Sequence, residues 1–475
     1  MNDLQKFYEE KGQGHVFAFF DTLSELEQSN LTAQASAIDL DEIAELTATL
    51  INSPENESDA GSNSLEPAEF VPLPSSYDGN PGLWEEAQSQ GEAALRAGRV
   101  AAFTVAGGQG TRLGYDGPKG TFGVTPVLKN SLFQVFAEKI LASSHLYGRP
   151  IPWYILTSII NHDATVSFFE EHDYFGLSPE KVHFFSQGLM PAVDKDGKIL
   201  MSGHSQIALS PDGHGGALRA LVRSGSIRQM DADGIDVISY FQVDNPLIRC
   251  IDPSFIGFHL QSESDLSSKM VPKAYAKEKV GVFCRDGDRS LVVEYSDLPD
   301  ALAEETNDEG GLRFRAGSIA IHIFDRDFVD RIGSGREKSA RLPFHLAHKK
   351  VPFVNARGEV TTPAEPNAYK FEMFVFDALP FADNPVIIET AREDDFSPVK
   401  NAEGIDSAQT SRDDQLRQYV RWARAAGLAV QTDETGLPSL TFEVSPLFGD
   451  TPDRFMAKWQ ALDYKPELTD GLVLV

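Results

Sequence analysis

A regular alternation of apolar strands and amphipathic helices, which begins near residue 99, constrains the fold of this chain more than any other feature. Strands are expected in RVAAFTVAGG, PWYILTS, KVHFFSQ and DVISYFQVDN, and helices in SLFQVFAEKILASS, ATVSFFEEH and GALRALVRSGSIRQMDADG. Such alternation indicates an α/β fold with a mostly parallel sheet that helices cover on both faces. Ligands of these sheets bind beyond the carboxyl ends of the strands, so functional residues are expected in GGQGTRLG, TS, QG and DN.

Three segments are expected along the chain. Residues 1–97 form a helical region, with a linker near 53–67 where turn formers and acidic residues replace apolar ones. Residues 98–403 form the main α/β domain, and residues 404–475 form a small C-terminal domain that begins with a helix over about 411–426. The acidic N-terminal region either packs against the main domain or mediates association, and packing is the favoured expectation.

The charge and the cysteine content argue against several classes of function. A formal net charge of −29 repels phosphate polymers, so nucleic-acid binding across a broad basic face is not expected. A small phosphorylated ligand would need a local basic site and a metal ion. Cys250 and Cys284 fit no disulfide framework, which is typical of a reducing compartment. No apolar run could span a membrane and no signal peptide is evident, so a soluble cytoplasmic protein is expected.

The first candidate site is a glycine-rich segment that directly follows the first strong strand. Its glycines let the backbone approach a ligand closely and direct N–H groups at an anion. Arg112 and Lys119 follow, and their side chains can neutralise phosphate oxygens. The segment has neither the Walker A spacing nor the GxGxxG fingerprint, and a structural turn with surface cations is the alternative. The candidate nucleotide-binding residues here are Gly107, Gly108, Gln109, Gly110 and Thr111.

Asp244 is the candidate metal ligand. It follows the buried strand in DVISYFQVDN, so its carboxylate is expected at the ligand edge of the sheet. Carboxylate oxygens suit Mg2+, which usually completes its shell with water and phosphate oxygens. An aspartate that only caps the turn before Pro246 is the alternative.

These segments resemble the signature of eukaryotic-type UDP-sugar pyrophosphorylases, especially of UDP-N-acetylhexosamine pyrophosphorylases. After AGGQGTRLG and PKG come WYILTS, FFSQGLMPAVDKDGKI, LSPDGHGGALRAL, FQVDNPL, FRAGSIAIHIF, KFEMFVFD and REDDFSPVKNA, in the order of the family. The resemblance implies a Rossmann-like, GT-A-like nucleotidyltransferase domain that uses Mg2+. It also implies UTP and a hexose or N-acetylhexosamine 1-phosphate as substrates, and a UDP-sugar and pyrophosphate as products.

The resemblance also assigns roles to single residues. Gln187 would read the uracil edge, since an amide donates and accepts hydrogen bonds together. Lys400 would contact the sugar phosphate, while Arg112 and Lys119 would stabilise charge on the leaving pyrophosphate. His214 is expected to form hydrogen bonds rather than to act as a base, because the attacking phosphate is already anionic. The remaining implied residues are Gly213 near the nucleotide and, around the sugar, His214, Gly281, Glu294, Ser318, Phe374 and Phe376, of which the last two share one face of an expected strand.

Two departures from the family pattern fall at the implied sugar pocket. His214 stands where N-acetylhexosamine enzymes usually carry asparagine, and FRAGS replaces FNAGN, which places Arg315 and Ser318 at two asparagine positions. Three functions stay open: an N-acetylhexosamine uridylyltransferase, favoured by the overall resemblance; a glucose-1-phosphate, galactose-1-phosphate or broad UDP-sugar uridylyltransferase, favoured by these departures; and an inactive nucleotide-sugar-binding protein. A monomer or small homo-oligomer is expected, and the sequence names no partner for Arg315.

Overall fold

The computed structural model describes residues 3–53, 65–355 and 357–475, and the chain falls into two compact units. The larger unit comprises residues 64–186, 220–340 and 378–475, and the smaller unit comprises residues 1–63, 187–219 and 341–377. Residues 1–63 and 64–97 therefore belong to different units. The segment boundaries expected at residues 97 and 403 stay predictions.

A ten-stranded mixed sheet forms the centre of the larger unit, in the order β1-β11-β13-β9-β2-β3-β4, with β12 beside β11, β10 beside β13, and β18 beside β10. The neighbours β9, β2, β3 and β4 are parallel, as the strand–helix alternation predicts, and β13 runs antiparallel to β9. The strands are β1 (Leu65–Pro67), β2 (Val100–Val105), β3 (Trp153–Thr157), β4 (Val182–Ser186), β9 (Val237–Gln242), β10 (Leu266–Pro272), β11 (Val282–Asp286), β12 (Arg289–Val293), β13 (Ala316–Asp325) and β18 (Val386–Glu389).

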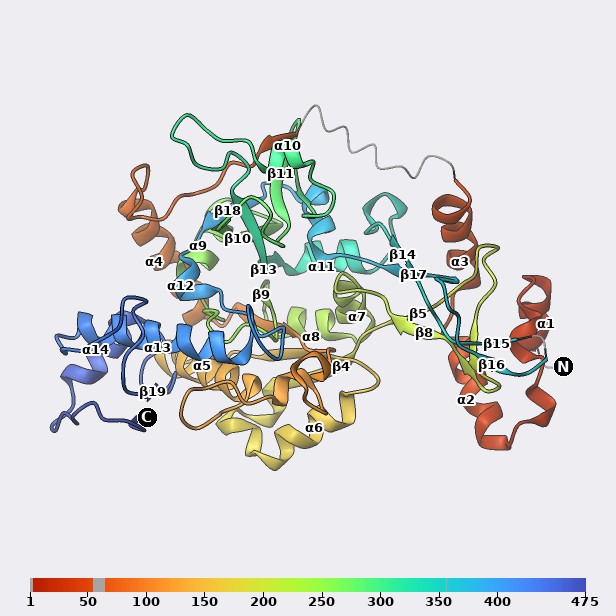
Figure 1. Ribbon diagram of the computed structural model, residues 1–475, viewed down its shortest axis with the longest axis horizontal. Helices are drawn as coiled ribbons and strands as arrows, with labels where there is room; N and C mark the ends of the chain where they lie inside the picture. Colours follow the sequence, from red (N-terminus) through yellow and green to blue (C-terminus); the bar gives the residue numbers. More distant parts are fainter. Residues whose placement is uncertain (1–2, 54–64, 356) are drawn as a thin grey trace. The chain divides into compact units, whose positions relative to one another are not determined.

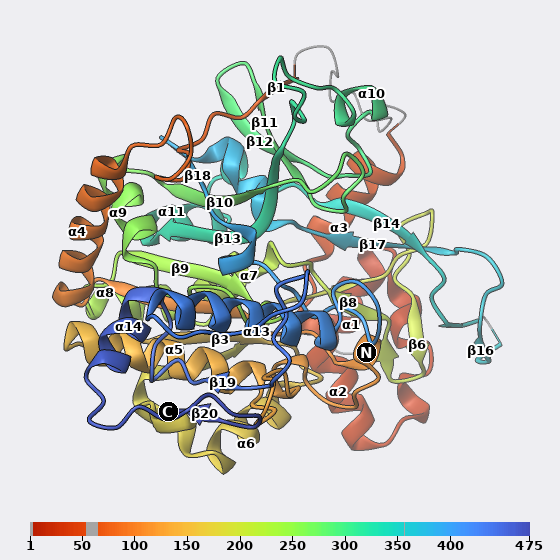
Figure 2. The same cartoon turned by 60° about the vertical axis from the view of Figure 1, so that its left-hand side comes forward.

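Helices flank this sheet (Figures 1 and 2). Trp153 of β3 packs edge-on against Phe133 of α5 and Phe169 of α6, with ring centroids 6.3 and 5.4 Å away. Helices α4 and α9 lie so close that a Cβ on Gly91 would come within 1.8 Å of a backbone oxygen of the facing helix. The helices are α4 (Pro81–Ala97), α5 (Leu132–Tyr147), α6 (His162–Glu171), α8 (Ser226–Ala232), α9 (Pro253–Gln261), α10 (Asp300–Ala303), α11 (Arg326–Gly333) and α12 (Arg392–Asp395). Helix α7 (Gly216–Arg223) begins in the smaller unit and ends in the larger one.

The C-terminal residues of the larger unit have a small core of their own. Helix α13 (Ala408–Ala425) matches the helix expected there, while α14 (Pro452–Gln460) was not predicted. Two short strands pair in parallel: β19 (Glu443–Val444), which lies between the two helices in the chain, and β20 (Val473–Leu474), which follows α14. The core between these elements includes Trp422, Phe442, Phe455 and Trp459.

The smaller unit begins with helices, as predicted for the first 52 residues: α1 (Asp3–Glu10), α2 (Glu25–Ser36) and α3 (Leu40–Leu46). Their apolar faces share a core with Met190 and Phe371. Four two-stranded sheets complete the part of this unit that the structure describes. They pair β5 (Leu189–Pro191) with β8 (Leu209–Pro211), β6 (Met201–Gly203) with β7 (Gln206–Ile207), β14 (His345–Lys349) with β17 (Ala368–Glu372), and β15 (Phe353–Val354) with β16 (Val360–Thr361).

Most of the predicted linker, residues 54–64, lies outside the described residues. Its last three residues, Leu65–Pro67, form β1 and pair with β11, so regular structure begins inside the approximate bounds of the predicted linker. Among the described helices, none combines the length and the apolar character needed to cross a membrane.

Candidate active site

Lys119 and Asp244 meet at the carboxyl edge of the large sheet. Lys119 opens a short 3-10 turn, Lys119–Thr121, and its backbone N–H donates to the carbonyl of Gly108 at 3.0 Å. The Lys119 ammonium lies 3.4 Å from Oδ2 of Asp244, and the two side chains are only 16% and 15% exposed. This separation is long for a hydrogen bond. The two groups therefore neutralise each other without a close bond, and both can still exchange partners with a ligand.

Two positions of the turn after β2, Gly108 and Gly110, carry glycine for different physical reasons. A Cβ on Gly110 would lie 2.6 Å from the ring of Tyr115, so internal packing explains this glycine. A Cβ on Gly108 would meet no atom within 4 Å, so internal packing does not explain that one. The backbone there faces open space, which is available to a ligand.

The turn after β2 is fixed by Asn161, a residue that lies in the turn after the neighbouring strand β3 and that the sequence analysis did not single out. Asn161 is fully buried, and its Nδ2 donates to the carbonyls of Ala106 and Gly108 at 3.0 and 3.3 Å. Its Oδ1 accepts from the N–H of Ser158 at 2.8 Å. The turns after β2 and β3 are thus joined through one amide, and the position of Asn161 just after a predicted strand was the available signal.

The other two predicted cations are more exposed. Arg112 lies on a 3-10 turn, Thr111–Leu113, and its guanidinium has no hydrogen-bond or ion-pair partner within the described part of the chain. The Lys400 ammonium lies 5.9 Å from the ring centre of Phe396 and 3.9 Å from Oδ2 of Asp406. Burial raises the pKa of Asp406 above its usual range, and the charge of Lys400 partly opposes this shift.

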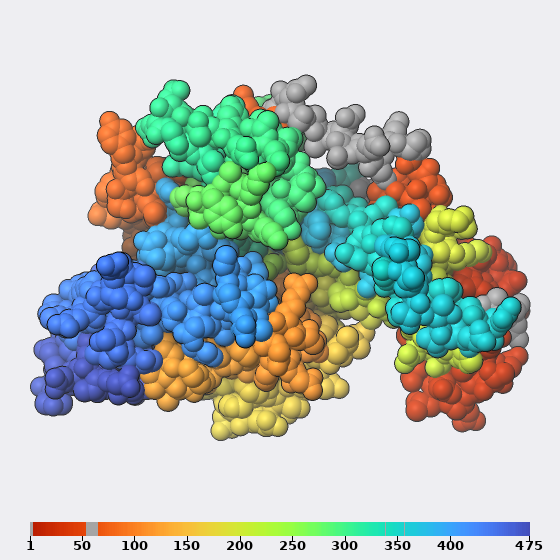
Figure 3. Space-filling model, viewed as in Figure 1, coloured from red at the N-terminus to blue at the C-terminus, as the bar shows by residue number. Residues whose placement is uncertain are grey.

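The loop 123–130, which leads from Lys119 to α5, is held by the C-terminal residues. Arg412 and Gln415 of α13 donate to two carbonyls of this loop at 2.9 and 3.1 Å. Glu443 is 2% exposed, and its Oε2 accepts from two backbone N–H groups of the loop at 2.8 and 2.9 Å. In Figure 3 the C-terminal part, in blue, lies directly against this region, in orange. The loop that follows Lys119 is therefore fixed by residues far along the chain.

Three of the residues implied at the sugar also come together in the larger unit. The N–H of Ser318 on β13 donates to the carbonyl of Gly281 at 2.8 Å. Glu294, the first residue after β12, has its Oε1 3.8 Å from the position that a Cβ on Gly281 would take. Arg315 lies with its guanidinium 5.2 Å from the ring centre of Phe70, which supplies the partner that the sequence could not name.

The smaller unit contains Phe374 and Phe376, and the strand expected through them is wrong. Strand β17 ends at Glu372, and a 3-10 turn, Val375–Phe381, follows. The chain turns here because the N–H of Val375 donates to Nδ1 of His214 at 3.1 Å. Both phenylalanine rings still face this histidine, with ring centroids 5.3 and 5.7 Å from the His214 ring.

His345, another residue missed by the sequence analysis, extends this group of rings. It stacks on Phe374 at 4.6 Å, and its Nε2 lies 2.7 Å from Oδ2 of Asp377. Burial, with a smaller effect from the His345 charge, lowers the pKa of His214 to about 4. Because Nδ1 of the neutral ring accepts from Val375, the hydrogen lies on Nε2, and His214 presents one donor. We call His214, Phe374, Phe376 and His345 the ring cluster.

Gln187 and Gly213 contact each other in the smaller unit. Nε2 of Gln187 donates to the carbonyl of Gly213 at 2.6 Å. Gly213 has a φ of +82°, and a Cβ there would lie 2.3 Å from the carbonyl oxygen of Met373. The fold alone therefore requires glycine at this position, whatever ligand the turn holds.

Comparisons with known proteins agree on one family. A family model described as UTP–glucose-1-phosphate uridylyltransferase matches residues 61–412. The chain is 39% identical over 441 residues to UDP-N-acetylhexosamine pyrophosphorylase-like protein 1 of Xenopus tropicalis, with 90% of this chain and 86% of that protein covered. It is 36% identical over 449 residues to UDP-N-acetylglucosamine pyrophosphorylase of Saccharomyces cerevisiae, with 91% and 93% covered. The solved structure of UDP-N-acetylglucosamine pyrophosphorylase from Trypanosoma brucei, in complex with an inhibitor, matches with a TM-score of 0.82 at 26% identity and covers 100% of this chain and 98% of that chain.

Proposed function

The chain belongs to the UTP–glucose-1-phosphate uridylyltransferase family, and from this membership we propose that it joins UTP to N-acetylglucosamine 1-phosphate. The products are UDP-N-acetylglucosamine and pyrophosphate. An oxygen of the sugar phosphate attacks the α-phosphorus of UTP, and the bond from that phosphorus to the β-phosphate oxygen breaks. One phosphoanhydride replaces another, so the reaction is readily reversible.

The observation that carries this proposal is the pair of Lys119 and Asp244 at the carboxyl edge of the large sheet, 3.4 Å apart. Two polyanions must meet in this reaction, so catalysis consists mainly of positioning and charge neutralisation. Lys119 and Arg112 stabilise the charge that develops on the leaving pyrophosphate, and Lys400 orients the attacking phosphate. The open space at Gly108 supports close approach of the nucleotide to the backbone N–H groups of residues 107–111.

We propose Mg2+ as the ion that Asp244 holds. Within the described residues, no group of three or more His, Cys, Asp or Glu side chains could form a metal cage. A single partly buried carboxylate fits an ion that takes the rest of its shell from water and substrate phosphates, as Mg2+ does. When bound, such an ion neutralises phosphate charge and orients the phosphates. Asp244 would hold such an ion through its carboxylate, and Lys119 would bind phosphate oxygens beside it.

The residues near the sugar and the base keep their proposed roles. Gly281, Glu294 and Ser318 contact the sugar, with the Glu294 carboxylate accepting hydrogen bonds from hydroxyl groups. In the smaller unit, His214 donates through Nε2 to the sugar, and Phe374 and Phe376 present ring faces to it. Gln187 and Gly213 bind the nucleotide. Support for these roles comes from the contacts within each group and from family membership.

We also propose that the enzyme works in the cytoplasm. The support is that Cys250 and Cys284 are both free and buried. Burial raises the pKa of both thiols to about 12, so both stay protonated and unreactive.

The test of the proposed function is pyrophosphate release from UTP with a panel of sugar 1-phosphates. We expect kcat/KM to be highest for N-acetylglucosamine 1-phosphate, ahead of the N-acetylgalactosamine, glucose and galactose 1-phosphates. A preference for glucose or galactose 1-phosphate would replace the proposed sugar, in line with His214 and Ser318 in place of asparagines. No turnover with any sugar would instead support an inactive nucleotide-sugar-binding protein.

A further inference from the structure

Asn245 directly follows the proposed metal ligand and uses both ends of its side-chain amide on another part of the chain. It is 6% exposed. Its Nδ2 donates to the carbonyl of Asp395 at 2.6 Å, and its Oδ1 accepts from the N–H of Ser397 at 3.0 Å. The N–H of Val399 also donates to the carbonyl of Asp244 at 2.8 Å. Three hydrogen bonds therefore join residues 244–245 to the segment 395–399.

The segment 395–399 is anchored on its buried side by Asp395. The Asp395 carboxylate accepts from the N–H of Arg249 at 2.8 Å, from Oγ1 of Thr390 at 2.6 Å and from the Lys269 ammonium at 2.6 Å. Lys269 is 1% exposed and also pairs with Asp252 at 2.7 Å. Removing one partner of a buried charge group is strongly destabilising, so this end of the segment has little freedom to move.

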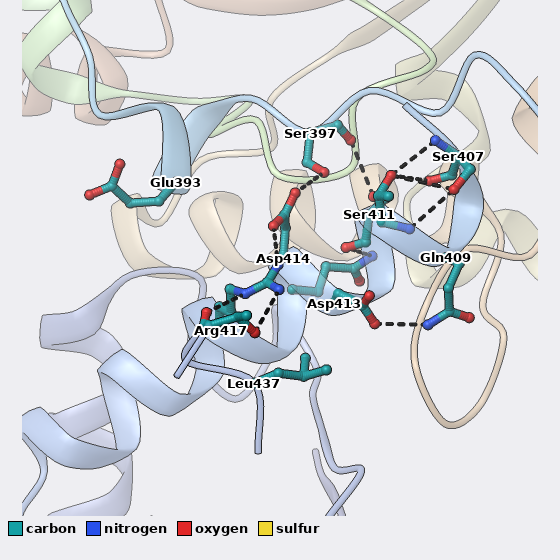
Figure 4. Close-up of polar contacts among 12 residues, drawn as sticks. Glu393, Ser397, Ser407, Gln409, Ser411, Asp413, Asp414, Arg417 and Leu437 are labelled. Carbon is teal, nitrogen blue, oxygen red and sulfur yellow. Dashed lines mark hydrogen bonds and ion pairs between the residues drawn. The ribbon is translucent and has the colours of Figure 1, made fainter. Parts of the chain in front are cut away.

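Helix α13 holds the same segment from its other side (Figure 4). Oγ of Ser397 donates to Oδ2 of Asp414 at 2.7 Å, and Oγ of Ser411 donates to the carbonyl of Ser397 at 3.2 Å. Asp414 is itself paired with Arg417 at 2.7 Å. The segment thus runs between a buried charge network and a helix, and the next residue after it is Lys400.

We propose that Asn245 is a positioning residue that sets Lys400 at a fixed place relative to Asp244. This inference rests on the proposed function, in which Asp244 holds the ion that neutralises the phosphates of UTP and Lys400 orients the attacking phosphate. In-line transfer requires these two groups to keep one geometry, and a misplacement of about 1 Å can cost a factor of about 100 in rate. Asn245 is the side chain that links them, because it lies next to one and binds the segment that carries the other.

The first measurement compares Asn245→Ala with a matched control, Asn367→Ala. Asn367 also bonds both ends of its amide to backbone groups, with its Oδ1 2.8 Å from the N–H of Val351 and its Nδ2 3.0 Å from the carbonyl of Val351. We expect Asn245→Ala to lower kcat about 10- to 100-fold while the Kd for UTP changes less than about threefold. Asn367→Ala should leave kcat within about twofold. Should Asn245→Ala unfold, Asn245→Ser is the substitute, since its hydroxyl can still satisfy one of the two backbone groups.

The second measurement is a double-mutant cycle with Lys400→Ala. If Asn245 acts through Lys400, the double variant should have a kcat/KM within about threefold of Lys400→Ala alone, because coupled residues are not additive. If kcat/KM of the double variant instead falls by the product of the two single losses, the positioning role of Asn245 is overturned and the proposed function stays intact. Full activity of Lys400→Ala would remove Lys400 from the proposed function and overturn the positioning role with it. Equal kcat values for Asn245→Ala and Asn367→Ala would also overturn it.

Discussion

The charged edge of the large sheet and the ring cluster of the smaller unit are built on different principles. At the edge, Lys119, Asp244 and Lys400 carry full charges, and the backbone around them is fixed by neighbouring loops and by the buried amides of Asn161 and Asn245. In the ring cluster, His214 is neutral, Phe374 and Phe376 are apolar, and the Phe374 ring stacks on both His214 and His345.

This difference indicates how the two regions should respond to change. The electrostatic interaction between charged groups is strong at short range and depends on their positions. Substitutions at the edge should therefore cause large losses of activity. Ring contacts contribute about 0.5–1.5 kcal/mol each, so the ring cluster should lose function in small steps. Changes at the charged edge should therefore have larger effects on turnover than changes in the ring cluster.

Removal of divalent metal should have the largest effect, and only at the charged edge. Chelation with EDTA should reduce pyrophosphate release to background, and added Mg2+ should restore it, because the phosphates then lose their neutralising ion. Binding of the free sugar phosphate, followed by calorimetry, should weaken much less. Full turnover in excess EDTA would show that Asp244 serves another purpose.

Replacement of Lys119 should have the second-largest effect on turnover. Lys119→Ala removes a cation from the site of developing charge and should lower kcat about 100- to 1,000-fold, measured as initial rates of pyrophosphate release. The matched control is Lys181→Ala, because Lys181 also pairs with an aspartate, at 3.6 Å, but stands at the amino end of β4. If both variants turn over equally, the cation of Lys119 has no part in the reaction.

Loss of a ring from the ring cluster should have a moderate effect. Phe374→Ala removes the ring that stacks on both His214 and His345, and we expect KM for the sugar 1-phosphate to rise about tenfold. KM for UTP should stay within about twofold. Tyr369→Ala is the control, since its ring stacks on His348 at 4.6 Å within the β14–β17 pair. An unchanged sugar KM in Phe374→Ala would argue against the ring cluster as a sugar surface.

The smallest effect on turnover at neutral pH is expected from the last change, which concerns the dependence of folding stability on pH. Burial lowers the pKa of His214 to about 4, whereas an unfolded histidine has a pKa near 6.5. Between these values the unfolded chain binds more protons, so the stability that this ring contributes is complete above about pH 6.5 and is lost as the pH falls towards 4.

His214→Asn isolates this contribution. The difference in unfolding free energy between the wild type and His214→Asn should shift by about 1–3 kcal/mol against the wild type from pH 7 to pH 4.5, measured by urea denaturation. His259, whose pKa burial also lowers to about 4, is present in both proteins and cancels. If the unfolding free energies of the wild type and His214→Asn change in parallel across this pH range, His214 is not desolvated in solution.

Prediction from sequence succeeded where the signal was local. The strands β2, β3 and β9 are mostly apolar runs, because strands inside a parallel sheet are buried on both faces. The meeting of Lys119 and Asp244 followed from the rule that carboxyl ends of parallel strands share one edge. Family resemblance then placed this edge in a uridylyl transfer.

Prediction failed where a distant residue decides the local structure. Phe374 and Phe376 alternate like strand residues, yet the bond from Val375 to His214, 161 residues away, turns the chain. Asn245 was visible beside Asp244, but its partner at Asp395 lies 150 residues further on. Strands such as β5 and β8, with three residues each, are too short to leave a periodic signal.

The Glu443 carboxylate has a consequence for the order in which the enzyme is assembled. A ribosome makes residues 123–130 more than three hundred positions before it makes Glu443, the residue whose carboxylate binds the N–H groups of Val127 and Leu128. A nascent chain can therefore complete most of its sheet while the loop beside Lys119 still lacks this anchor. The geometry of the loop after Lys119 is therefore complete only once Glu443 has been made.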